Sequence, residues 1–199
     1  MRLVDQSLVS KLKDYYKVNP RVIAFVLTES EWRSLYTWDA DCIRIKVEHG
    51  AKAPKLTSSH HVAGGLDLKD WSALLVNRWK QAHFWLAGRS FPKLPKCFDD
   101  INIEDFDHLI FIRLTRVIDR ECHPCRVKDI CPNLLGYLTH EFIHIVEYEQ
   151  DSKILPETPE GYYSYVGAVV KEIFRDELSI AEKVESERDL ARTVSSHDS

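Results

Sequence analysis

The feature that most constrains this chain is one segment, His140-Glu141-Phe142-Ile143-His144, inside an apolar stretch. Two histidines four residues apart lie on one face of a helix, so their ring nitrogens can bind a single Zn²⁺. The intervening Glu141 then faces the water that the metal binds and can take its proton as a general base. Because leucine, isoleucine and valine flank the segment, the sequence predicts an amphipathic helix from Pro132 to about Gln150 that carries a metal site.

Composition limits the class of protein in which such a helix can occur. Of the 199 residues 44% are hydrophobic and five are Trp, too apolar for a disordered chain, and the length favours a single domain over residues 1–199. No apolar run is long enough to span a membrane, and charged residues interrupt the N-terminus where a signal peptide would be apolar. We therefore expect a cytoplasmic protein with no membrane partner. The net charge of −4 disfavours a nucleic-acid partner without excluding a local basic patch.

Hydrophobic periodicity and turn residues predict the other elements. Helices are expected over residues 4–17, 30–36, 67–87 and 158 to about 190, the last with a bend. Strands are expected over residues 21–27, 42–48 and 108–118. Loops are expected over residues 49–66, 91–104 and 119–131, and a frayed tail over 193–199. The sequence therefore predicts an α+β fold.

A catalytic zinc needs a third protein ligand as well as an open position. The metzincin pattern would place a glycine at position 147 and a histidine at position 150, where this chain has Glu147 and Gln150. A histidine four residues beyond His144 is ruled out as well, because Tyr148 stands there. The remaining route is a carboxylate from a following helix.

Glu172 and Asp176 are the candidate pair on that helix, one turn apart on the same face. Glu172 can bind zinc, while Asp176 can accept the N–H of a ligating histidine and so set its tautomer. Three other carboxylates compete with Glu172 for the role of ligand: Glu147, Glu160 and Glu177.

This pattern over residues 108–180 resembles the gluzincin metallopeptidases, the thermolysin-like clan, in their minimal single-domain form. The resemblance implies a zincin-like core with a small sheet, an active-site helix and a glutamate helix. It implies that His140, His144 and Glu172 are the zinc ligands, that Glu141 is the general base, and that Asp176 accepts the N–H of a ligating histidine. The implied substrate is a peptide or protein. The family's transition-state residue has no unique match here, and the candidates are Tyr162, Tyr163 and Tyr165.

The three parts of the chain differ in what they carry. Residues 1–104 form an N-terminal part of helix and strand with no recognised motif. Residues 105–192 bear the motifs, and residues 193–199 are the tail.

A second signal is a cysteine cluster formed by Cys122, Cys125 and Cys131, with Cys97 as a fourth member from upstream. Four thiolates can hold a structural zinc or an iron–sulfur cluster. The CxxC-x5-C spacing resembles the cluster motif of iron–sulfur nucleases associated with CRISPR and recombinational repair, although no nuclease carboxylate–lysine set accompanies it. Free thiols or a disulfide are the alternatives. Since Cys131 precedes Pro132, a centre here would clamp the start of the active-site helix.

The leading hypothesis from the sequence is therefore a zinc-dependent metallopeptidase. Two alternatives stay open: a non-catalytic metal-binding or regulatory protein on a zincin scaffold, and an iron–sulfur-containing protein that processes nucleic acid.

Overall fold

The computed structural model describes residues 1–36, 73–77, 94–102, 105–114, 132–180 and 183. Within these ranges the chain is an α+β fold whose helices and strands are, in order, β1 (Arg2–Leu3), α1 (Gln6–Tyr16), β2 (Val22–Leu27), β3 (Ala73–Asn77), the 3-10 turn η2 (Lys96–Phe98), β4 (His108–Arg113), α5 (Pro132–Glu149) and α6 (Pro159–Ile173). Residues 29–36 are also helical. None of the described helices is long and apolar enough to cross a membrane.

The sheet has the strand order β1-β2-β4-β3. The central strands β2 and β4 run parallel, whereas β1 and β3 are antiparallel to their neighbours. Register places Ala24, Ile110 and Leu75 in one row across three strands, and successive rows face opposite sides of the sheet. The sheet therefore presents two apolar faces.

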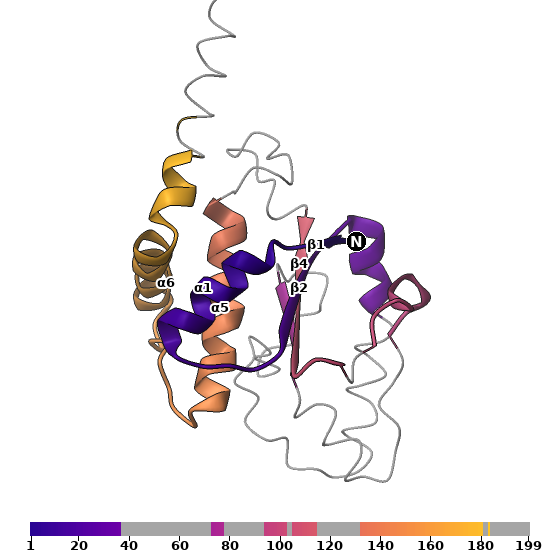
Figure 1. Ribbon diagram of the computed structural model, residues 1–199, viewed down its shortest axis with the longest axis horizontal. Helices are drawn as coiled ribbons and strands as arrows, with labels where there is room; N and C mark the ends of the chain where they lie inside the picture. Colours follow the sequence, from indigo (N-terminus) through magenta and orange to yellow (C-terminus); the bar gives the residue numbers. More distant parts are fainter. Residues whose placement is uncertain (37–72, 78–93, 103–104, 115–131, 181–182, 184–199) are drawn as a thin grey trace, which may run out of the picture.

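Each face of the sheet is covered by its own layer (Figure 1). Helices α1, α5 and α6 lie on one side, and the helix at 29–36 and η2 lie on the other. Because both faces are covered, β4 is a nearly continuous apolar run, and Leu109, Ile110, Phe111 and Ile112 are all fully buried. This two-sided burial is the reason that its sequence lacks the alternation of a half-exposed strand.

The expected helix over residues 67–87 is wrong for its described part, because Ala73–Asn77 is the strand β3. A short apolar run fits a helix face and a buried strand equally well. Antiparallel pairing with β4 decides between them, since it places Leu74 and Val76 in the buried cluster that contains Trp32 on one face and Leu75 in the cluster on the other. The aromatic residues that suggested a helix lie outside the described residues.

Most other predictions for the described residues are confirmed. Helix α1, strands β2 and β4 and helix α5 begin and end no more than five residues from their predicted bounds. Helix α6 begins as predicted, with the Thr158 hydroxyl accepting a hydrogen bond from the Gly161 N–H. It ends at Ile173, and residues 175–180 are helical again after Phe174, so the helix is interrupted at that residue. Most of the predicted continuation to about residue 190 lies outside the described residues. The predicted strand 42–48, loops 49–66 and 119–131, and tail 193–199 lie outside the described residues.

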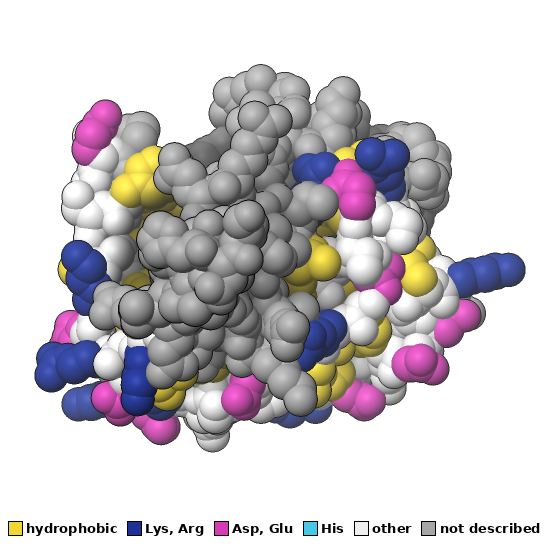
Figure 2. Space-filling view, turned by 90° about the horizontal axis from the view of Figure 1, so that it is seen from above, with side chains coloured by type: hydrophobic (Ala, Val, Ile, Leu, Met, Phe, Trp, Pro, Cys, Tyr) yellow, Lys and Arg dark blue, Asp and Glu magenta, His cyan; other side chains and the backbone are white. Residues whose placement is uncertain are grey.

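Charged side chains of both signs are mixed on the face shown in Figure 2. Among the residues described there, Lys and Arg lie between Asp and Glu, and neither sign forms a continuous patch.

Candidate metal centre

Helix α5 carries the candidate site and lies in the middle of its layer, packed against β3 and β4 on one side and against α1 and α6 on the other. Its sequence explains this position, because Leu135, Leu138, Phe142, Ile145 and Val146 are fully buried and cover several faces of the helix. A helix held on all these sides keeps its side chains in fixed places.

The two histidines of α5 converge. His140 Nε2 lies 3.1 Å from His144 Nε2, and the rings meet edge to face with centroids 4.6 Å apart. Their side chains are 12% and 11% exposed. Burial, with a smaller effect from His144, lowers the pKa of His140 to about 3, so its ring is neutral near pH 7. The pair therefore offers nitrogen donors to a common point.

Glu141 and Tyr162 border this pair. Glu141 is 1% exposed, and its Oε1 lies 3.7 Å from His140 Nε2. The Tyr162 ring packs edge to face on His140 at 4.7 Å. Burial raises the pKa of Tyr162, and the nearby Glu141 charge raises it further, so the hydroxyl keeps its proton at neutral pH. A carboxylate and a neutral hydroxyl thus stand next to the two imidazoles.

Glu147, three residues after His144, has partners for both carboxylate oxygens. Oε2 lies 3.0 Å from His144 Nδ1. Oε1 accepts the backbone N–H groups of Ile154 and Leu155 at 2.8 and 2.7 Å. Burial alone would raise the pKa of Glu147, but the hydrogen bonds from His144, Leu155 and Ile154 outweigh it, and the pKa lies below its ordinary value. Glu147 therefore links the second histidine to the segment that leads into α6.

The structure does not bring Glu172 to the histidine pair. Glu172 accepts a hydrogen bond from the Tyr15 hydroxyl at 2.9 Å, on the side of α1. It also follows Tyr162 by ten residues on the same helix, which is about 15 Å along the axis. Asp176 lies beyond the interruption at Phe174 and is exposed.

The competing carboxylates lie elsewhere as well. Glu177 is buried in an ion pair with Lys11, and Glu160 is exposed in the first turn of α6. Across the part of the chain that the structure describes, no three His, Cys, Asp or Glu side chains are placed to hold one metal ion. The third ligand stays a prediction.

Cys97 is the only described member of the predicted cysteine cluster. It lies exposed in η2, with its sulfur 3.2 Å from the Ser34 hydroxyl. Cys122, Cys125 and Cys131 fall outside the described residues, so the second centre stays a prediction.

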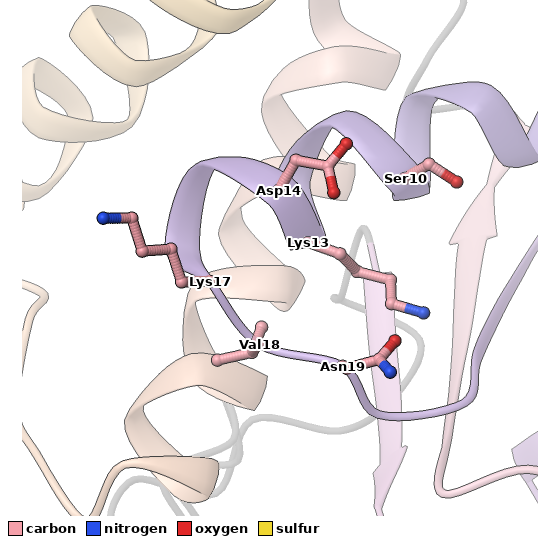
Figure 3. A pocket seen from close by; sticks show the side chains of 6 residues that line it. All are labelled: Ser10, Lys13, Asp14, Lys17, Val18 and Asn19. Carbon is pink, nitrogen blue, oxygen red and sulfur yellow. The ribbon is translucent and has the colours of Figure 1, made fainter.

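A surface pocket lies apart from the histidine pair, at the end of α1 (Figure 3). It is lined by Ser10, Lys13, Asp14, Lys17, Val18 and Asn19. These residues belong to α1 and the turn after it, and none belongs to α5 or α6. The pocket therefore forms no part of the candidate site.

Sequence reasoning missed the role of Glu147, which it treated only as a rival third ligand. The available signal was the spacing, because residues three apart on a helix share a face and Glu147 follows His144 at that interval. Comparisons of the chain with protein-family models, with curated proteins and with solved structures found no match.

Proposed function

We propose that this protein is a zinc-dependent hydrolase that cleaves peptide bonds, with His140 and His144 as two zinc ligands and Glu141 as the general base. The observation that carries the proposal is the 3.1 Å approach of the two Nε2 atoms beside a buried carboxylate. Two nitrogens that bind one tetrahedral zinc at 2.0–2.1 Å stand about 3.3 Å apart, so little movement separates this arrangement from a ligand pair.

The protonation of His140 also suits a metal. A ligating histidine must be neutral with its lone pair free, and burial keeps the His140 ring neutral. Its other nitrogen, Nδ1, is buried, and no described residue makes a hydrogen bond to it. It can therefore carry the ring proton once Nε2 gives its lone pair to a metal.

Glu172 is the third ligand in this proposal, as the resemblance to the gluzincins implies. To serve, its carboxylate must leave the Tyr15 hydroxyl and approach the histidines.

Bound zinc would supply a Lewis acid that polarises the scissile carbonyl. Glu141 then accepts the proton of the attacking water and later delivers it to the leaving amine. Its burial beside His140 excludes bulk water from this exchange. Tyr162, protonated at neutral pH, can donate a hydrogen bond to negative charge that develops on the substrate oxygen.

Zinc content tests the ligand set. Wild-type protein should hold one zinc per chain at the site, and His144→Ala should hold none there, since removing a ligand removes most of the binding free energy. Glu172→Gln should also lose zinc, whereas Glu160→Gln, a matched change at an exposed carboxylate of α6, should keep it. Full zinc at this site in His144→Ala would overturn the assignment. Full zinc in Glu172→Gln would show that another residue is the third ligand.

Glu141→Gln separates the metal site from the chemistry. The amide is too weak a base to take a proton from water, so the variant should keep its zinc and lose peptide hydrolysis. The measurement is cleavage of a peptide library with wild type, Glu141→Gln and Glu160→Gln in parallel. If wild type binds zinc but cleaves nothing, the non-catalytic metal-binding alternative takes the place of this proposal. Undiminished cleavage by Glu141→Gln would remove Glu141 from its role.

A further inference from the structure

Glu147 makes a set of contacts that the proposed chemistry does not use. Its side chain is 4% exposed in the last turn of α5, and it meets three hydrogen-bonding groups. Two are backbone N–H groups, of Ile154 and Leu155, and both reach the same oxygen, Oε1. The third is His144 Nδ1, which reaches only Oε2. This division of contacts between the two oxygens determines which ring nitrogen of His144 carries the proton.

We propose that Glu147 is the positioning residue that fixes the tautomer of His144, with the ring proton on Nδ1 and the lone pair on Nε2. A carboxylate only accepts hydrogen bonds, so the nitrogen facing Oε2 at 3.0 Å must be the N–H. The opposite nitrogen, Nε2, then presents its lone pair toward His140 Nε2 at 3.1 Å. The tautomer itself is independent of any metal, but its use in metal binding rests on the proposed function.

The same carboxylate ties this tautomer to the position of the next helix. Ile154 and Leu155 belong to the segment between α5 and α6, and Leu155 is buried against the main core. That segment leads to Thr158, which caps α6, and four residues later to Tyr162 on the His140 ring. The orientation of His144 and the placement of Tyr162 therefore share one anchor.

Replacement of Glu147 by its amide should reverse the tautomer without changing the shape of the side chain. The two backbone N–H groups at Oε1 require an oxygen there, so the oxygen of Glu147→Gln must stay in that place. Its NH₂ group then faces His144 Nδ1 and can only donate. His144 must accept at Nδ1, and its proton moves to Nε2, where it blocks metal binding. A purely structural tether would show no such reversal, because the oxygen still holds Ile154 and Leu155.

Nitrogen NMR on the full-length protein tests the tautomer directly. Protein labelled with ¹⁵N-histidine, treated with chelator and held at about pH 8, gives ring signals that distinguish Nδ1–H from Nε2–H. The His144 signals are assigned by their loss in His144→Gln. We expect Nδ1–H in wild type and Nε2–H in Glu147→Gln. Glu157→Gln, a matched change at an exposed carboxylate in the same connecting segment, should leave Nδ1–H in place.

Two results would overturn the inference: Nε2–H at His144 in the wild type, or Nδ1–H retained in Glu147→Gln. The wild-type spectrum decides the matter alone if Glu147→Gln fails to fold. Zinc titration of the same proteins adds the link to function, where Glu147→Gln should bind about ten- to a hundredfold more weakly than wild type and Glu157→Gln should bind equally. A wild type with the expected tautomer but no zinc affinity would refute the proposed function and leave this inference standing. Zinc binding with the opposite tautomer would refute this inference and leave the proposed function standing.

Discussion

Two glycines on the helices around the site should respond with opposite signs to the same substitution, glycine to alanine. Gly136 lies in the second turn of α5, four residues before His140, and a Cβ at this position meets no described atom within 4 Å. Gly161 lies in the first turn of α6, where a Cβ would stand 2.9 Å from the Thr158 hydroxyl oxygen and 3.0 Å from Pro156 Cβ. At both sites alanine restricts the unfolded backbone and so favours folding, but only at Gly161 does the added Cβ clash with neighbouring atoms.

The magnitudes follow from these surroundings. Alanine in a helix interior is favoured over glycine by about 0.5–1 kcal/mol, because it restricts the unfolded chain more. No atom of the described residues opposes this gain at Gly136, so Gly136→Ala should raise the free energy of unfolding by about that amount. At Gly161 the Thr158 hydroxyl must turn away from the helix N-terminus, and loss of such a cap costs about 0.5–2 kcal/mol. The rigid ring of Pro156 must also shift, so Gly161→Ala should lower the free energy of unfolding by about 0.5–1 kcal/mol.

Urea unfolding of chelator-treated protein, followed by far-ultraviolet circular dichroism, measures both changes. The two variants should differ by about 1–2 kcal/mol, or several degrees in Tm for a chain of this length. Gly167→Ala is the matched control within α6, since a Cβ there also meets no described atom within 4 Å, and it should gain as Gly136→Ala does. Equal stabilisation by Gly161→Ala would refute the reasoning, because it would show that the Thr158 cap contributes nothing.

Three further changes test the core, the site and the metal. Phe142→Ala should lower the free energy of unfolding by about 3–5 kcal/mol in chemical denaturation, because Phe142 is fully buried and stacks on Tyr16 at 6.3 Å; Phe142→Leu should cost much less. Tyr162→Phe should lower kcat for peptide cleavage by about a hundredfold at unchanged zinc content, and an unchanged kcat would exclude its hydroxyl from the reaction. Zinc at a hundredfold excess over Kd should stabilise wild type by about 2.7 kcal/mol in a thermal scan, and His144→Ala should show no such shift.

Local pattern was enough to predict the elements whose sequence has one consistent interpretation. The helical repeat and the Thr158 cap located α5 and α6, and a β-branched run located β2. It failed at Ala73–Asn77, where the apolar residues fit either structure and the pairing partner β4 made the choice. Such pairing depends on contacts distant in sequence, so a local period cannot reveal it.

The features of the candidate site divide in the same way into those that local sequence predicts and those that it does not. Convergence of His140 and His144 follows from helix geometry alone, since residues four apart share a face. The roles of the carboxylates do not, because they depend on where neighbouring helices and turns place their donors. The Glu147 carboxylate is held in place by backbone N–H groups seven and eight residues further along the chain, and the Glu172 carboxylate by a hydroxyl on α1. Neither partner is visible in the local sequence.

The position of Glu172 leads to a last prediction about motion. Its hydrogen bond to Tyr15 is exposed and contributes no more than about 1 kcal/mol, far less than the roughly 10 kcal/mol that a structural zinc can supply. Loss of that bond is therefore no obstacle. The obstacle is distance, because Glu172 follows Tyr162 by ten residues, which places the carboxylate about 15 Å further along α6.

If Glu172 is the third ligand, zinc must therefore shift α6 along α5. The same shift would carry Tyr162 away from His140, so Tyr162 acts in the reaction only if another residue is the third ligand. Spin labels at two exposed positions, Gln150 directly after α5 and Ala168 on α6, would report such a shift as a change in their separation on addition of zinc. The same labels in His144→Ala should show no change. If zinc binds and the distance between the two labels stays constant, the ion takes its third ligand from elsewhere in the chain. Glu172 then only accepts the hydrogen bond from the Tyr15 hydroxyl and so links α6 to α1.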